Sequence, residues 1–207
     1  MEEKFSLLEE AVDQLKKGGL IIIVDDIKRE NEGDFIGAGI KVTPETVNFM
    51  INYGRGAFIA LFCEDAWCKK IGIVSQIEEK NNTEKNKTQM MTSIDCVKVT
   101  SGSSAYDRAM TVRTFSDSNS VPSDLIRPGH VIPIRGAIDG LNERHGHTEA
   151  GLEMVKLAGF DPVVAIDLEI LNDKGEMASR KELFELSEKF DLPIISIHQI
   201  LKHKGLE

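Results

Sequence analysis

The sequence predicts an α+β fold, in which a three-layer α/β/α single domain is built around a mixed sheet. Short apolar runs that read as buried strands alternate along the chain with segments whose apolar residues recur at helical spacing. No internal repeat, linker or low-complexity tract interrupts this alternation. The 207 residues are enough for one substantial core, so we expect one domain over residues 1–207.

The first half of the chain begins with a helix over 6–17, where apolar residues keep a helical spacing until two glycines end the segment at Gly18. The unbroken apolar run 20–24 predicts a short buried strand. Thr43 is a good helix cap and Pro44 suits the first helical position, so a second helix is expected there. It should run to residue 52, followed by a strand at 57–62, a helical turn at 65–70, a strand at 93–99 and a helix at 105–114.

The second half shows the same alternation. Thr148 is expected to cap a helix that ends near Ala158, and Ser179 with Glu182 forms a capping box for a later helix. Residues 76–88 are polar and lack periodicity, so we expect a mobile loop that is either a lid or a plain surface excursion. The other elements expected are strands at 131–134, 163–171 and 193–197, and a terminal helix at 198–204.

Composition and charge narrow the classes of partner and compartment. The chain has 34 acidic and 25 basic residues, a formal net charge of −9, which argues against nucleic acid because phosphate backbones need clustered Lys and Arg. The acidic N-terminus does not resemble a signal peptide, and no apolar run approaches the roughly 18 residues of a membrane span, so we expect no membrane partner. The three cysteines lack zinc-site or disulfide-framework spacing, and a reducing, cytoplasmic location is expected.

An acidic stretch directly follows the first predicted strand. Residues 25–34 contain five acidic and two basic side chains, in a place where loops at strand ends often carry ligand sites. Glu30, Glu32 and Asp34 alternate, so an extended backbone would point them to one side. Such a row repels itself unless a cation or a polyhydroxy ligand lies among the carboxylates. The plainer alternative is an exposed acidic loop.

Histidines and a second carboxylate pair are the next candidates. His130, His145 and His147 each lie beside glycine, which permits close approach of a ligand to the backbone. A lone histidine is usually a surface or satisfied core residue, but His147 next to a helix start would suit a metal ligand or an acid/base group. Asp167 and Glu169 share one side of an apolar strand. They face solvent on an edge strand, or they are acid/base groups with pKa values tuned by burial.

A segment of small residues at 100–104 joins a predicted strand to a helix start. Its backbone N–H groups and hydroxyls, including Thr100 and Ser103, would face an anion such as phosphate, although serine-rich helix starts are also common caps. No Gly-Lys-Ser/Thr follows, so this is not a Walker loop. Carboxylates with an imidazole and without nearby thiolates favour Mg²⁺ (or Mn²⁺) over structural zinc. Together these groups indicate proton-shuttling chemistry on a sugar phosphate.

Seven segments occur in an order that identifies a family. They are 25–34, 53–56, 93–95, 104–108, 127–131, 146–150 and 169–170. Each is weak alone, but the ordered set is highly specific and extends over nearly the whole chain. It resembles the 3,4-dihydroxy-2-butanone 4-phosphate synthases of riboflavin biosynthesis.

This resemblance implies a reaction. The substrate would be a small-molecule sugar phosphate, D-ribulose 5-phosphate, and the products 3,4-dihydroxy-2-butanone 4-phosphate and formate. The family uses Mg²⁺ (or Mn²⁺) and works as a homodimer with each active site near the subunit interface. The implied metal ligands are Glu30 and His147. The implied catalytic residues are His130, Glu169, Glu32 and Asp34, and the implied substrate-binding residues are Arg29, Glu30, Asp34, Thr100, Ser103, Arg144, His145, Gly146, His147, Thr148 and Glu169.

The chain departs from the family pattern at a few positions. Ile27 and Lys28 follow the two aspartates, Ile59 stands where a cysteine near the substrate is common, and Met91 replaces a threonine. Two other readings stay open, a divergent member acting on a different ketose phosphate and a non-catalytic sugar-phosphate sensor. A second catalytic domain, such as GTP cyclohydrolase II, does not fit in this length and is not expected.

Overall fold

A mixed sheet of eight strands runs through the centre of the protein in the computed structural model, which describes residues 4–26 and 29–206. The strands run in the order β4-β6-β3-β7-β2-β1-β8, and β5 pairs with β6. The strands are β1 (Ile21–Val24), β2 (Gly33–Ala38), β3 (Ala60–Cys63), β4 (Gln89–Met90), β5 (Ile94–Cys96), β6 (Leu125–Arg135), β7 (Val164–Glu169) and β8 (Ile194–Ser196). The α-helices are α1 (Leu8–Lys17), α2 (Pro44–Gly54), α3 (Asp65–Lys70), α4 (Ala105–Phe115), α5 (His147–Leu157), α6 (Arg180–Phe190) and α7 (Ile197–Lys204).

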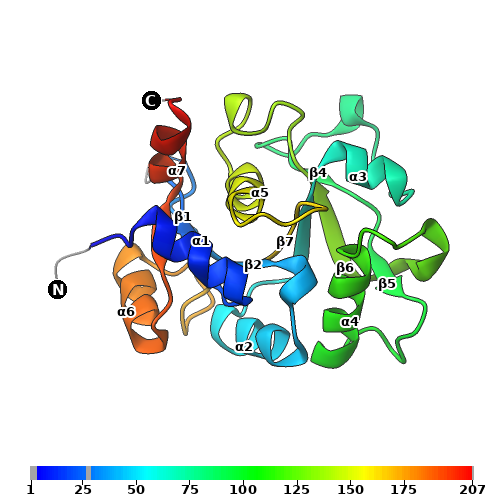
Figure 1. The fold of residues 1–207 in the computed structure, drawn as a ribbon, viewed down its shortest axis with the longest axis horizontal. Coiled ribbons are helices and arrows are strands. Elements are labelled where there is room, and N and C mark those ends of the chain that lie inside the picture. The colour runs from blue at the N-terminus through cyan, green and yellow to red at the C-terminus, as the bar shows by residue number, and fades with distance from the viewer. Residues whose placement is uncertain (1–3, 27–28, 207) are drawn as a thin grey trace.

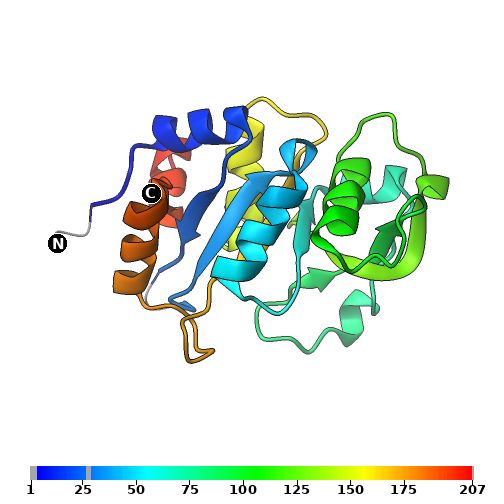
Figure 2. The same ribbon diagram turned by 90° about the horizontal axis from the view of Figure 1, so that it is seen from below.

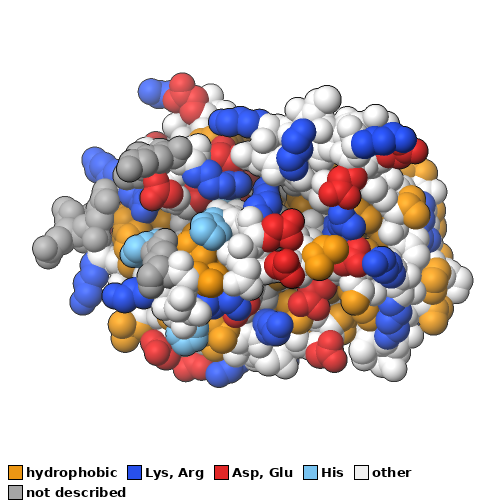
Figure 3. Space-filling view, turned by 90° about the horizontal axis from the view of Figure 1, so that it is seen from above, with side chains coloured by type: hydrophobic (Ala, Val, Ile, Leu, Met, Phe, Trp, Pro, Cys, Tyr) orange, Lys and Arg blue, Asp and Glu red, His pale blue; other side chains and the backbone are white. Residues whose placement is uncertain are grey.

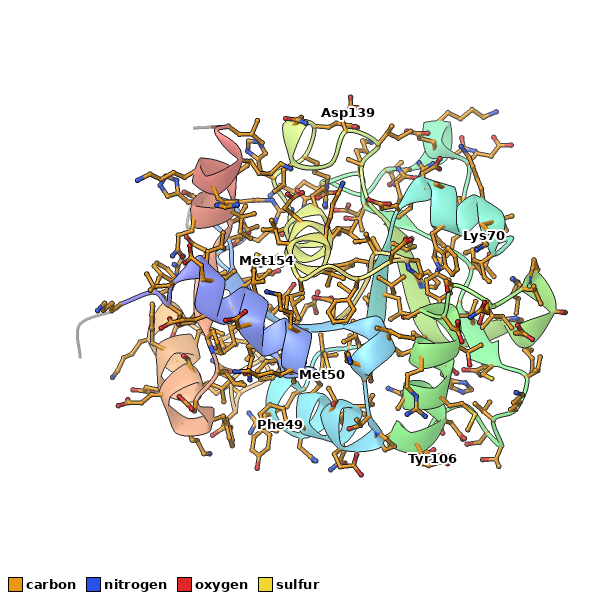
Figure 4. All side chains as sticks on the ribbon, in the orientation of Figure 1. Phe49, Met50, Lys70, Tyr106, Asp139 and Met154 are labelled. Atoms are coloured by element: carbon orange, nitrogen blue, oxygen red, sulfur yellow. The ribbon has the colours of Figure 1, made fainter. Side chains whose placement is uncertain are left out.

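Both faces of the sheet are covered, which confirms the three-layer α+β fold. One apolar cluster includes residues of α2, α4 and α6, and the other includes residues of α1, α5 and α7. Met50 of α2 and Met154 of α5, both labelled in Figure 4, belong to these two separate clusters. Figure 1 shows α5 and α2 on opposite sides of the sheet, and Figure 2 shows α6, α2 and α4 in a row across its lower face.

The register of the central strands brings distant acidic residues together. β2 and β7 are antiparallel, with Asp34 opposite Glu169 and Ile36 opposite Asp167. On its other side β7 pairs with β3, where Ala60 is opposite Asp167. The edge-strand reading of β7 is therefore wrong, and Asp34, Asp167 and Glu169 share the face of the sheet on which α5 packs.

Most helices begin and end near the predicted residues because their caps are local. Thr43 and Ser179 accept backbone N–H bonds at the starts of α2 and α6, as predicted. The predicted cap Thr148 is wrong, because the extended Gly146 is the N-cap and His147 is the first residue of α5. The strand expected at 131–134 is longer, since β6 continues back to Leu125 to pair with β5.

Charged side chains of both signs lie on the surface, and the cysteines lie in the interior. On the face drawn in Figure 3, acidic and basic side chains are interspersed, and the described residues there form no continuous basic patch. Over the described ranges, no helix is both long and apolar enough to cross a membrane. Cys63, Cys68 and Cys96 are buried free thiols.

Two adjacent residues of α2 test the packing of this layer. Met50 is fully buried, whereas Ile51 is 38% exposed. Met50→Ala is expected to lower the free energy of unfolding by about 2–5 kcal/mol, because it leaves a cavity beneath α2. Ile51→Ala, the matched control, should change it by no more than about 0.5 kcal/mol. Urea unfolding measures both values, and equal losses would contradict the assignment of the buried face.

Candidate active site

Asp25 organises the acidic loop that follows β1. Its fully buried carboxylate accepts the backbone N–H groups of Glu30 at 3.2 Å and Glu32 at 2.9 Å. It also accepts Nη1 of Arg29 at 2.9 Å. These bonds bend the chain into a turn with Asn31 at φ 55°, so the extended backbone expected through Glu30 is wrong. Extended structure begins only at β2.

The side chains of this loop nevertheless meet at one cavity of about 240 Å³. Its walls come from the acidic loop, the start of α5, strand β7 and the loop before β4. Eight predicted site residues line it, namely Arg29, Glu30, Glu32, Asp34, Arg144, His147, Thr148 and Glu169. Asp167, Phe58, Phe62, Glu84, Asn86, Thr88, Met90 and Ile134 complete the lining. The reading of 25–34 as a plain exposed loop is therefore wrong for Glu30, Glu32 and Asp34.

Three side chains are placed to hold a cation. Ligand atoms of Asp25, Glu30 and His147 all lie within 4.8 Å of one another. The buried Nε2 atom of His147 has no hydrogen-bond partner among the described residues, so it is free to bind a metal. Two carboxylates and an imidazole suit Mg²⁺ or Mn²⁺. Asp25 was not predicted as a ligand. Its position directly after an apolar strand could have indicated it, because ligand sites collect at the ends of strands.

Burial shifts the proton affinities of the cavity residues. Burial, aided by repulsion from Glu30 and Asp34, raises the pKa of Glu32 to about 7. Burial also raises the pKa of Asp34 to about 7 and that of Glu169 above its usual value. Glu32 and Asp34 can therefore exchange protons near neutral pH.

The imidazole of His147 shifts in the opposite direction. Burial lowers its pKa to about 4, so the ring is neutral at physiological pH. A neutral imidazole is the form that binds a metal ion.

Residues 76–88 lie against the cavity. Within them, residues 79–81 form a short 3₁₀ helix, and Asn86 donates a hydrogen bond to Glu30. Arg144 donates from Nε to the carbonyl of Asn86 at 3.3 Å and from Nη2 to the hydroxyl of Thr88 at 3.2 Å. Its Nη1 atom pairs with Glu149 at 2.7 Å. Arg144 thus joins this loop to the start of α5.

Several predicted residues lie away from this cavity. His130 on β6 is paired through Nδ1 with Oδ2 of Asp95 at 2.7 Å, and 44% of its side chain is exposed. Thr100 and Ser103 lie in the loop next to this pair, since a Cβ added to Gly102 would meet both Asp95 and His130. The exposed His145 lines a different hollow, and Gly146 is the N-cap of α5.

The predicted anion cradle at 100–104 already holds an acidic side chain. The Asp107 carboxylate accepts the backbone N–H groups of Thr100, Ser101 and Gly102. Asp107 occupies the third position of α4, where an acidic side chain can turn back toward the preceding loop. The hydroxyl of Thr100 also donates to Asp107, at 3.0 Å, while Ser103 is exposed.

Two departures from the family pattern lie in the core. Ile59 and Met91 are buried in the apolar cluster on the α2 side of the sheet, and neither lines the cavity. Ile27 and Lys28 lie outside the described residues.

The fold and the site define a metal-dependent enzyme with a small polar cavity. A family model for 3,4-dihydroxy-2-butanone 4-phosphate synthase matches residues 9–203, and the chain belongs to this family. The riboflavin biosynthesis protein RibBA of Porphyromonas gingivalis is 40% identical over 207 residues, which cover 99% of this chain and 50% of that protein. RibBA of Aquifex aeolicus is 41% identical over 206 residues, with 98% and 50% covered. The chain thus spans about half the length of these curated relatives.

Solved structures agree with this assignment. RibBX, a two-domain 3,4-dihydroxy-2-butanone 4-phosphate synthase from A. baumannii, has a TM-score of 0.90 and 32% identity, over 96% of this chain and 58% of its own. A 3,4-dihydroxy-2-butanone 4-phosphate synthase in complex with two magnesium ions has a TM-score of 0.89 and 30% identity, over 96% of both chains.

The cation site is tested by Mn²⁺ binding to the purified protein. His147→Asn is expected to weaken Mn²⁺ binding by more than about 100-fold, because loss of a ligand exceeds the usual cost of losing a supporting hydrogen bond. His203→Asn, an exposed histidine of α7, is the matched control and should bind as the wild type does. Titration calorimetry measures both, and unchanged binding in His147→Asn would exclude His147 as a ligand.

Proposed function

We propose that this chain converts D-ribulose 5-phosphate to 3,4-dihydroxy-2-butanone 4-phosphate and formate, in riboflavin biosynthesis. The observation that carries the proposal is the meeting of Glu30 and His147 within 4.8 Å at a cavity lined by further carboxylates. Family membership adds the reaction class. The two products together contain all the atoms of the substrate, so the reaction needs neither a co-substrate nor a redox partner.

The residues of the cavity divide into two roles. Glu30 and His147, with Asp25 beside them, would hold Mg²⁺ (or Mn²⁺). A cation held there would supply Lewis acidity toward the ketose carbonyl and its neighbouring C–H. Glu32 or Asp34 then removes the C3 proton to form an enediol, since both have pKa values of about 7. Glu169, opposite Asp34 on β7, is placed for the later proton transfers.

The phosphate end of the substrate is assigned to the arginine side of the cavity. Arg144 and Thr148 line the cavity and also line an adjoining hollow of about 310 Å³. Lys87 and Arg135 line that hollow as well, together with three glutamates, Glu79, Glu143 and Glu149. Guanidinium groups bind phosphate through paired N–H donors.

A second copy of the chain completes the site in this proposal. His130, Thr100 and Ser103 form a separate exposed cluster, away from the cavity that holds Glu30 and His147. Asp95 binds Nδ1 of His130, so Nε2 is the nitrogen available to a bound substrate. A homodimer would bring this cluster of one subunit to the cavity of the other.

The three free thiols fit the reducing cytoplasm as the compartment.

Formate release from ribulose 5-phosphate and Mg²⁺ tests the reaction directly. The wild type should release formate, and a chelator should stop the release. Glu30→Gln and His147→Asn should each abolish release while the circular dichroism spectrum stays unchanged, because they remove metal ligands without a change in packing. A panel of other ketose phosphates serves as the control for specificity. Retained turnover in either variant would exclude the metal assignment.

Mixed dimers test the contribution of the second subunit. His130→Asn and His147→Asn should each be inactive alone. After they are unfolded together and refolded as a mixture, half of the dimers contain both variants and one intact site, so about a quarter of the wild-type activity should return. Refolding each variant alone is the control. If the mixture stays inactive while the refolded wild type is active, the shared site is excluded.

A further inference from the structure

Asp167 is a buried carboxyl group that the proposed mechanism leaves without a role. It lies on the central strand β7 and is 6% exposed. Its neighbours in register on both sides, Ile36 and Ala60, are apolar. A carboxyl group in such surroundings costs free energy unless its charge or its hydrogen bonds are satisfied.

The partner of Asp167 is another acid. The two carboxyl groups lie on the same face of neighbouring strands, and no described donor reaches the buried Oδ1 atom of either one. Burial, followed by the charge of Asp34 and the contact with it, raises the pKa of Asp167 well above its usual value. Two adjacent buried carboxyl groups cannot both be ionised, so one of them keeps a proton. The contact between Asp167 and Asp34 is therefore a hydrogen bond in which the two carboxyl groups share one proton.

Asp34 also faces the candidate metal ligand. Its Oδ2 atom lies 3.4 Å from Nδ1 of His147. A carboxylate near this nitrogen favours the tautomer that leaves Nε2 for a metal. Asp167, Asp34 and His147 thus form a continuous series from the interior of the sheet to the cavity.

We propose that Asp167 is a positioning residue, whose hydrogen bond holds the Asp34 carboxylate between the bound sugar and His147. The catalytic part of this inference rests on the proposed function, whereas the effect on the metal site does not. Without the hydrogen bond, Asp34 would be free to rotate away from His147, because its Oδ1 atom has no other partner among the described residues. Both proton removal and metal binding would then weaken.

A purely structural role makes a different prediction. Replacement of both members of a buried polar pair by apolar residues is often neutral, whereas removal of one member costs stability where it leaves the other buried and unpaired. If Asp167 only filled space between β2 and β3, valine would replace it without loss. If it positions Asp34, valine keeps the strand but removes the donor, whereas asparagine keeps a donor in its amide group.

The experiment compares Asp167→Val and Asp167→Asn in the full-length protein. Asp167→Val should lower kcat by about 10-fold or more, with a smaller change in KM, and should weaken Mn²⁺ binding by about 10-fold. Asp167→Asn should keep both values within about threefold of the wild type. Melting temperatures should be equal to or above that of the wild type for both.

Ile166→Val is the matched control on the same strand. Ile166 is fully buried on the opposite face of β7. The change should lower stability by about 1 kcal/mol and leave kcat and Mn²⁺ binding unchanged.

The outcomes separate the two proposals. Wild-type kcat and Mn²⁺ binding in Asp167→Val would overturn the positioning role. An equal loss of kcat and Mn²⁺ binding in Asp167→Asn would also overturn it, because a hydrogen-bond donor at this position would then not suffice. A large fall in the melting temperature of both variants would overturn it as well. If the wild type releases no formate, the proposed function fails, but Mn²⁺ binding by the two variants still tests the connection from Asp167 to His147.

Discussion

Crowding of carboxylates in a largely buried cavity is the constraint on which this structure depends. Like charges held close together in surroundings of low polarity repel strongly. The chain offsets part of this cost with fixed donors, as Asp25 receives two backbone N–H groups and the Arg29 guanidinium. Part is offset because burial beside Asp34 raises the pKa of Asp167, which favours its neutral form. A bound divalent cation would offset the repulsion that remains among the carboxylates. The site therefore depends on the cation for its electrostatic stability.

The order of the strands is what brings these groups together. β2 and β7 are separated by about half of the chain, yet their pairing places Asp34 directly opposite Glu169. The start of α5 lies over the same part of the sheet, so His147 reaches a loop that precedes it by more than a hundred residues. Gly151 lets α5 approach closely, since a Cβ there would lie 3.0 Å from the Phe62 ring. The close packing of α5 on β3 is therefore part of the geometry of the cation site.

Local signals in the sequence predicted where helices begin. The pairing of strands decided which side chains face the interior, and local signals do not reveal that pairing. The starts of α2 and α6 were predictable because a cap such as Thr43 acts within four residues. Thr148 was misassigned because a glycine in an extended conformation can also begin a helix, and only the packing of His147 distinguishes the two. Whether Asp167 faced solvent or the interior depended on which strands flank β7, which no pattern within 163–171 reveals. The motif resemblance named the cavity residues, but it did not separate them from the His130 cluster.

That separation has a consequence for how activity relates to assembly. One chain would supply the proposed cation ligands and several carboxyl groups, but among the described residues His147 is the only histidine that lines the cavity, and its pKa of about 4 makes it a poor proton donor at neutral pH. A reaction that must protonate a departing hydroxyl group needs an acid with a higher proton affinity. Carboxyl groups such as Glu32 are available once they have accepted a proton, and in the proposed homodimer His130 of the other subunit would lie beside them. In the proposed arrangement, turnover requires the dimer but metal binding does not. Dilution that dissociates the dimer should therefore abolish turnover and leave metal binding unchanged.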